Sequence, residues 1–135
     1  MRILAVILAA VAAFPAAAET PRGPDAVPFR LYVHDTFRVW SKLLPQDRGP
    51  LWEYCRSEEE IMRDHPGEEV WLGAAAHCVA DGELDSDYGG TRLAACEYYI
   101  KAERHYVKAR VKPEEAEALR LSIEEVKAGI AALEC

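Results

Sequence analysis

The chain has 135 residues, a formal net charge of −7 and four cysteines. A chain of this length suits one domain with a single core. Its acidic balance argues against a nucleic acid or an anionic membrane as the binding partner, because both attract lysine and arginine. It leaves room for a basic protein partner.

The N-terminal residues 1–18 are predicted to be a secretory signal peptide. Arg2 supplies the positive charge, and the apolar run from Ile3 to Phe14 has about 12 residues, too few for a membrane-spanning helix of about 20 residues. Small residues then precede Glu19. We therefore expect cleavage before Glu19, export to the periplasm or the medium, and no membrane attachment afterwards.

Residues 19–27 are rich in proline and glycine, so we expect a flexible leader before a single helical domain over 28–135. A first helix is predicted from apolar residues at steps of three and four, which are Phe29, Val33, Phe37, Trp40 and Leu44. A strand over 29–33 is the competing interpretation, because apolar residues alternate there too. The segment 45–50, with proline at both ends, ends this helix.

A second helix is predicted over 51–64, with Cys55 on its apolar stripe. The alternative is a capping box of Ser57 and Glu60, which would start the helix later and leave Cys55 in a loop. The longer helix is favoured. A third helix should begin near Pro66. Its apolar stripe comprises Trp71, Ala74, Ala75 and Cys78.

Two further helices are predicted toward the C-terminus. The fourth begins after Thr91 as its N-cap, and Tyr99 and Tyr106 widen its apolar stripe. That stripe comprises Leu93, Cys96, Ile100, Glu103 and Val107. The fifth follows a break at Pro113, and its stripe comprises Ala116, Leu119, Ile123, Val126, Ile130 and Leu133. Its opposite face, which we expect to be solvated, carries Glu115, Arg120, Glu124, Glu125 and Lys127.

The whole pattern predicts an all-α fold, a small disulfide-bonded helical bundle of four to five helices, with the first lying across an up-down bundle of the others. Four cysteines in an exported chain predict two disulfides. Cysteines on neighbouring helices lie at similar distances from the turn that joins those helices, which places all four at one end of the bundle. Cys96 and Cys135, however, differ by about 10 Å in their position along the helix axes, and this disfavours a bond between them. We therefore expect the pairs Cys78–Cys96 and Cys55–Cys135.

Gly82 is predicted to end the third helix, and an acidic loop covers 81–90. The loop carries four candidate calcium ligands, which are Asp81, Glu83, Asp85 and Asp87. The spacing of a helix–loop–helix calcium site is not met, because Ser86 stands where glycine is required and Arg92 where a bidentate glutamate is required. We expect neither a bound metal nor a cofactor.

The residues do not form a recognisable catalytic motif. The four histidines, none of which has another three or four residues away, are His34, His65, His77 and His105. There is no nucleophile-elbow serine and no glycine-rich phosphate loop. We therefore expect the protein not to be an enzyme.

Charge is distributed unevenly along the chain. Residues 53–87 contain eleven acidic side chains against two basic ones, whereas residues 92–112 contain six basic side chains against two acidic ones. The favoured interpretation is that these segments pack together and complement each other. The alternative is a bipolar surface that steers a partner.

Two resemblances bear on function. The stretch 82–87 together with Ala95–Ala102 resembles half of a Sel-like helical repeat, but no second copy follows, and such folds need about three units to bury a core. The overall plan is similar to the small periplasmic immunity proteins of type VI amidase effectors, which are also exported, helical and cysteine-bridged. That similarity covers architecture alone and implies no site residues.

We accordingly expect a non-enzymatic protein-binding module, an inhibitor- or immunity-type partner of another exported protein. The alternative is a small ligand- or metal-binding periplasmic module that uses the acidic loop 81–90. The oligomeric state is left open.

Overall fold

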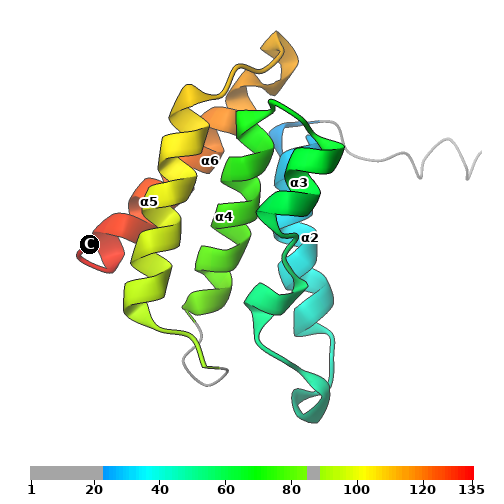
Figure 1. The fold of residues 1–135 in the computed structure, drawn as a ribbon, viewed down its shortest axis with the longest axis vertical. Coiled ribbons are helices and arrows are strands. Elements are labelled where there is room, and N and C mark those ends of the chain that lie inside the picture. The colour runs from blue at the N-terminus through cyan, green and yellow to red at the C-terminus, as the bar shows by residue number, and fades with distance from the viewer. Residues whose placement is uncertain (1–22, 85–88) are drawn as a thin grey trace, which may run out of the picture.

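The computed structural model describes residues 23–84 and 89–135, which form five α-helices and no strand (Figure 1). The helices are α2 (Pro28–Ser41), α3 (Glu58–Asp64), α4 (Glu69–Glu83), α5 (Arg92–Lys108) and α6 (Ala116–Ala132). Short 3-10 turns are η1 (Pro24–Ala26), η2 (Pro45–Asp47), η3 (Leu51–Tyr54) and η5 (Pro113–Glu115). The predicted small, disulfide-bonded all-α fold is confirmed.

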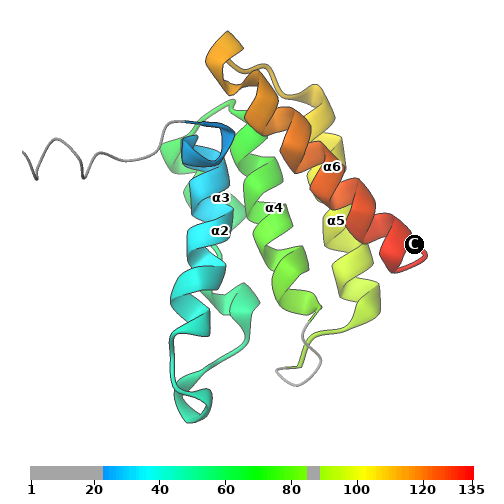
Figure 2. The ribbon, with the colours of Figure 1, turned by 180° about the vertical axis from the view of Figure 1, so that it is seen from behind.

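Helix α4 is the centre of the fold. It contacts α2, α3, α5 and η3, and Figures 1 and 2 show it between α5 on one side and α2 on the other. Small residues dominate its buried positions, which lets neighbouring elements approach closely. The predicted stop at Gly82 is wrong, because this glycine lies inside the helix against η3. A Cβ there would lie 2.6 Å from the backbone nitrogen of Trp52.

Two buried tyrosines of α5 pack where neighbouring helices carry glycine. The ring of Tyr106 lies against Gly73 of α4, where an added Cβ would come within 2.5 Å of the ring. The ring of Tyr99 lies in the same way against Gly129 of α6, at 2.8 Å. The absence of a side chain at these two positions therefore decides which face of α5 is buried.

The predicted apolar stripe of α5 is consequently on the wrong face, since Leu93 and Val107 are 70% and 60% exposed. The N-cap at Thr91 is confirmed, because its hydroxyl accepts the backbone N–H of Ala94. In α6 the buried face is rotated from the predicted stripe and comprises Ala118, Ser122 and Val126. The half-buried flank of α6 comprises Leu119, Ile123, Ile130 and Leu133.

The N-terminal half differs from the sequence expectation in two ways. Helix α2, which includes 29–33, runs alongside α4 instead of crossing the bundle, and α6 is the inclined helix (Figure 2). The predicted long helix over 51–64 is also wrong. The chain forms η3, becomes extended at Cys55, and starts α3 after Ser57, whose hydroxyl accepts the backbone N–H of Glu60 at 3.2 Å. The alternative of a later helix start, capped by Ser57 and with Cys55 outside the helix, is therefore confirmed.

Residues 23–27 pack against the domain although they belong to the predicted leader. Asp25 of η1 accepts hydrogen bonds from Arg30, and η1 contacts α6. The predicted signal peptide, residues 1–18, lies outside the described residues. None of the described helices combines the length and the apolar character that crossing a membrane requires.

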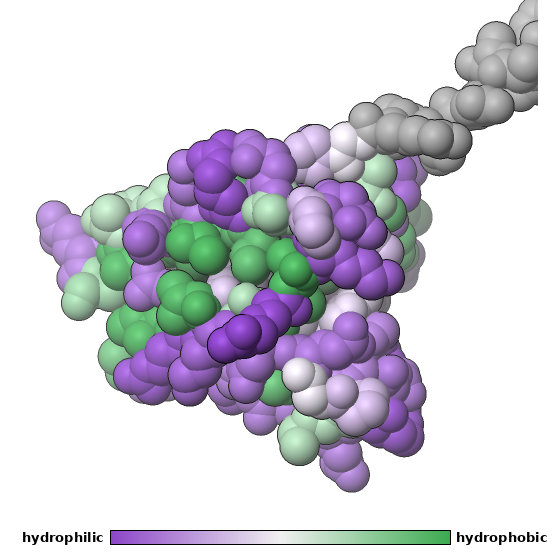
Figure 3. All heavy atoms as spheres, turned by 90° about the horizontal axis from the view of Figure 1, so that it is seen from above, coloured by the Kyte–Doolittle hydropathy of each residue, from purple (hydrophilic) through white to green (hydrophobic). Residues whose placement is uncertain are grey.

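The surface carries apolar as well as charged side chains. Exposed large apolar residues include Phe37, Val39, Met62, Leu93 and Val107. Figure 3, which views the molecule from above, shows apolar atoms gathered between hydrophilic groups. Single exposed apolar residues are ordinary, whereas contiguous ones mark interaction surfaces.

Candidate functional site

A groove between α3, α4 and α5 is the candidate binding site. It is open to solvent and has a volume of about 470 Å³. Ala75, Ala76 and Val79 of α4 form its floor, and Tyr98 of α5 lines it. The groove exists because the alanine methyl groups are too short to fill the space between the flanking helices.

Charged side chains of both signs form the rim of this groove. Lys101 of α5 makes an ion pair with Glu58 of α3, and Arg56 makes one with Asp64. The Lys101–Glu58 pair joins the basic helix to the acidic segment, as the favoured interpretation of the charge distribution expects. The rim therefore offers both a positive and a negative group to a partner.

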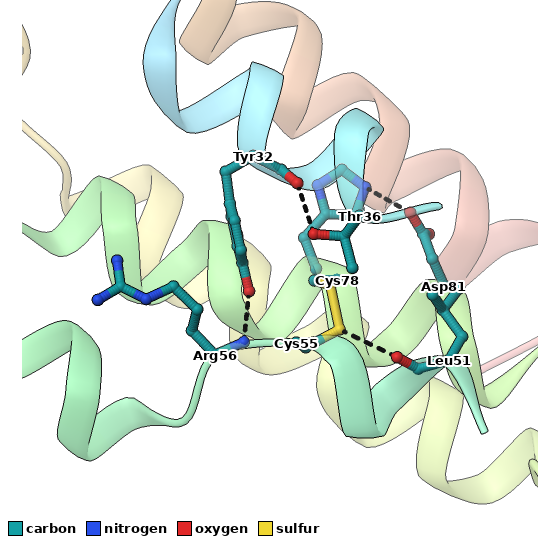
Figure 4. The surroundings of a disulfide bond; sticks show 8 residues. Tyr32, Thr36, Leu51, Cys55, Arg56, Cys78 and Asp81 are labelled. Atoms are coloured by element: carbon teal, nitrogen blue, oxygen red, sulfur yellow. Dashed lines mark hydrogen bonds and ion pairs between the residues drawn. A yellow bond between two sulfur atoms is a disulfide. The ribbon is translucent and has the colours of Figure 1, made fainter. Parts of the chain in front are cut away.

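A disulfide ties the rim of the groove to its floor. Cys55, which precedes Arg56, is bonded to Cys78, which precedes Val79, with 5.9 Å between the Cα atoms (Figure 4). The backbone N–H of Arg56 also donates to the hydroxyl of Tyr32 at 2.7 Å. These two ties fix the position of the rim before any partner binds.

All four cysteines are disulfide-bonded, as predicted, but the predicted pairing is wrong. The bonds are Cys55–Cys78 and Cys96–Cys135, not Cys78–Cys96 and Cys55–Cys135. The prediction placed Cys55 on a long helix level with the other cysteines. Because the chain is extended there, Cys55 instead reaches α4 directly.

The second disulfide depends on a turn at the C-terminus. Helix α6 ends at Ala132, and Glu134 adopts a left-handed conformation with φ 54°. The backbone N–H of Cys135 then donates to the carbonyl of Ile130 at 3.0 Å. This turn back removes the axial mismatch expected of a straight helix, and the Cα atoms of Cys96 and Cys135 lie 5.7 Å apart.

Two of the four candidate calcium ligands lie in a helix and not in the predicted loop. Asp81 and Glu83 belong to α4, and both carboxylates are engaged. Asp81 accepts the hydroxyl of Tyr99 at 2.6 Å, and Glu83 accepts the backbone N–H of Thr91 at 3.0 Å. The other two candidates, outside the described residues, are Asp85 and Asp87. Within residues 23–84 and 89–135, no three His, Cys, Asp or Glu side chains are arranged to hold a metal.

A buried arginine connects the N-terminal helix to the C-terminal one. Arg30 of α2 donates to the hydroxyl of Ser122 at 3.0 Å and to the carboxylate of Glu125 at 2.8 Å, both in α6. It also donates to Asp25 of η1 at 3.0 Å. Glu125, expected on the solvated face of α6, therefore neutralises a buried cation, which is the condition for burying one at acceptable cost.

His77 of α4 extends this polar network into the core. Its side chain is only 4% exposed. Nδ1 lies 3.0 Å from the hydroxyl of Tyr106, and Nε2 lies 3.7 Å from Asp81 and from Glu125. Burial lowers the pKa of His77 to about 4, although Glu125 acts to raise it. Burial raises the pKa of Asp81 to about 6, against the effect of its hydrogen bond with Tyr99.

The polar network joins helices and does not line the groove. His77, Tyr106 and Ser122 are buried and are absent from the groove lining. Within the described part of the chain, every buried side-chain nitrogen or oxygen has a hydrogen-bond partner. The network therefore positions α2, α4, α5 and α6 relative to one another, and the groove is the part that a ligand can reach.

Sequence reasoning missed most of this arrangement. It gave no role to Arg30, Ser122 or Tyr98, and it considered His77 as a metal ligand, whereas the residue is buried in the core. The partners of Arg30 lie 92 and 95 residues away in the chain, so no local pattern marks it. A run of three alanines over 74–76 is the one local signal of the groove floor.

Comparison with protein-family models, curated protein sequences and solved structures found no match to this chain.

Proposed function

We propose that this protein is a non-enzymatic, exported protein-binding module that acts as an inhibitor- or immunity-type partner of another exported protein. The observation that carries the proposal is the groove between α3, α4 and α5, with its apolar floor and a rim of both charges. An apolar side chain of the partner would cover the alanine floor. The charged rim would set the partner's orientation.

Residue types around the groove support a protein partner. Tyr98 lines the groove, and Met62 is 60% exposed on the face of α3 that also carries Glu58, four residues earlier. Tyrosine and methionine are enriched in protein interfaces, and methionine adapts its shape to a partner. Tyr98 would contact the inserted group, and Met62 would offer a further apolar contact on α3, outside the groove lining.

Covalent bracing also supports the proposal. The Cys55–Cys78 bond and the Tyr32–Arg56 hydrogen bond hold the rim in place, and a preorganised surface loses less entropy on binding. Two disulfides are typical of a small exported protein. The alternative of a ligand or metal site in 81–90 gains no support from Asp81 and Glu83, whose carboxylates are already hydrogen-bonded.

Site-specific photo-crosslinking tests the proposal. A photoreactive phenylalanine analogue replaces Tyr98 in one variant and Glu124, an exposed residue of α6, in a matched control. Both proteins are expressed in the periplasm and irradiated. We expect a discrete adduct with one protein from position 98 and none from position 124. Absence of an adduct specific to position 98 overturns the proposal.

Binding measurements with the captured protein complete the test. Val79→Arg places a charge on the groove floor, whereas Leu31→Arg places the same charge on an exposed part of α2. Titration calorimetry should show at least about tenfold weaker binding for Val79→Arg, equivalent to about 1.4 kcal/mol. Leu31→Arg should bind like the wild type. Equal affinities for the two variants contradict the groove as the binding site.

A further inference from the structure

The outer face of α5 carries an apolar line that the fold leaves uncovered. Leu93, Ile100 and Val107 follow one another at seven-residue spacing, which places them along one line of a helix. Leu93 and Val107 are largely exposed, and Ile100 is half-buried. Figure 1 shows α5 on the side of α4 away from α2, with the C-terminal end of α6 extending beyond it.

Charges of opposite sign border this line on one flank. Glu97 follows Leu93 by four residues and Arg104 follows Ile100 by four, so both charged side chains lie on the same side of the line. Among the described residues, neither charge makes an ion pair. A groove of about 500 Å³ on this flank leaves room for a facing side chain, and its lining comprises Glu97, Ile100, Lys101, Arg104, His105 and Lys108. Lys101 and His105 are already paired within the molecule, with Glu58 and Glu69.

We propose that two copies of this chain associate through α5, packed antiparallel about a two-fold axis near Ile100. In that arrangement Leu93 of each copy meets Val107 of the other, and the two Ile100 side chains meet at the axis. Glu97 of each copy is level with Arg104 of the other to within one residue, or about 1.5 Å of helix rise. In this arrangement Leu93 and Val107 at the two ends of the line each contact an apolar residue, and Glu97 and Arg104 each lie beside a residue of opposite charge.

The self-complementary pattern is the reason to assign a second copy as the occupant. A two-fold interface requires one surface to match itself when reversed, and this face presents apolar, acidic, apolar, basic, apolar side chains in that order. Reversal exchanges the acidic and basic positions, so each meets its opposite. An unrelated acidic or basic helix would satisfy only one of the two charges.

The expected association is weak. A single pair of helices of this length buries less than the about 1,200 Å² of a standard stable interface. We therefore expect a monomer–dimer equilibrium at micromolar or higher concentrations, detectable by sedimentation velocity over a concentration series. This surface is separate from the floor of the α3–α4–α5 groove, so Val79→Arg should dimerise like the wild type.

Charge reversal tests the proposal directly. Glu97→Arg and Arg104→Glu should each weaken self-association at least about tenfold, because each places like charges opposite one another. Mixing the two variants restores both opposite-charge pairs, so the mixture should sediment as a heterodimer, and the double variant should dimerise alone. Circular dichroism and thermal melts check that each variant is folded.

Apolar substitutions supply the second arm. Leu93→Asp should abolish the dimer without lowering the melting temperature, whereas Val39→Asp, at an exposed apolar position of α2, should leave the dimer unchanged. A wild type that stays monomeric up to millimolar concentration overturns the proposal. So does a dimer that survives Leu93→Asp, or two charge-reversal variants that fail to associate when mixed.

Discussion

His77→Gln should make the free energy of unfolding less sensitive to acid. Burial lowers the pKa of His77 from 6.5 to about 4. Below about pH 6.5 the unfolded chain therefore binds a proton at this residue that the folded chain does not bind. The stabilising contribution of neutral His77 is complete above about pH 6.5 and is lost as the pH falls toward 4. Glutamine keeps a hydrogen-bonding group for Tyr106 but does not titrate.

The size of the effect follows from the shift and from the groups that face the imidazole. At about 1.4 kcal/mol per pKa unit, the shift of His77 corresponds to a loss of about 3 kcal/mol. Asp81 and Glu125 lie near Nε2, and Tyr106 lies at Nδ1. The cations of α2 that disfavour protonation of His77 are Arg30 and, when charged, His34.

Asp81 acts in the opposite direction. Its folded pKa is raised from 3.8 to about 6, so the folded protein binds this proton first, and stability is gained as the pH falls through 6. Because the Asp81 side chain is 34% exposed, solvent screening reduces this gain to about 1 kcal/mol. The wild type should therefore lose about 2 kcal/mol from this pair between about pH 7 and pH 4.

Urea denaturation followed by tryptophan fluorescence, from about pH 7 to pH 4.5, measures these differences. Relative to the wild type, His77→Gln should become more stable as the pH falls, and Asp81→Asn should become less stable. Both comparisons cancel the contributions of carboxylates that are remote from His77 and Asp81. A gap between His77→Gln and the wild type that does not change with pH would refute the assignment of a buried neutral histidine.

Four further results are expected. Replacing Cys55 and Cys78 by serine should lower the free energy of unfolding by about 3.5 kcal/mol in denaturant melts. Replacing Cys96 and Cys135 by serine should lower it by about 4 kcal/mol, because the Cys96–Cys135 bond closes the longer loop. Gly73→Ala should destabilise by about 1–3 kcal/mol, since the new methyl group meets the ring of Tyr106, whereas Gly23→Ala, with open space around it, should be nearly neutral in the same assay. Millimolar calcium should leave the melting temperature unchanged, and a rise that Asp85→Ala removes would contradict this. Mass spectrometry of protein recovered from the periplasm should give an N-terminus at Glu19, and full-length protein in that fraction would disprove cleavage.

The helical character of the chain and the approximate positions of its helices could be predicted from local sequence patterns. The cap at Thr91, the breaks at proline and the absence of strands among the described residues all follow from interactions within a few residues. The long helix over 51–64 failed because apolar spacing was preferred to the capping signal of Ser57. A hydroxyl that accepts the N–H three residues later fixes a helix start more firmly than an apolar pattern extends it.

Helix faces and cysteine pairs could not be predicted in the same way, because they depend on residues distant in the chain. Arg30 is buried only because Ser122 and Glu125 lie beside it in space. Cys96 reaches Cys135 only because Glu134 turns the chain back. The periodicity of apolar residues indicates that a helix has an apolar side, but it does not identify the residues against which that side packs.

Helix α5 shows how this ambiguity bears on function, because two of its faces are apolar enough to be buried. The ring of Tyr106 packs against Gly73 and the ring of Tyr99 packs against Gly129, so the tyrosine face turns inward. The helical period then places the line from Leu93 to Val107 outside. Folding alone does not require apolar residues at seven-residue spacing on an exposed face, nor opposite charges placed symmetrically along it. The inward face accounts for the stability of the monomer, and the outward face is accounted for by pairing with a second copy.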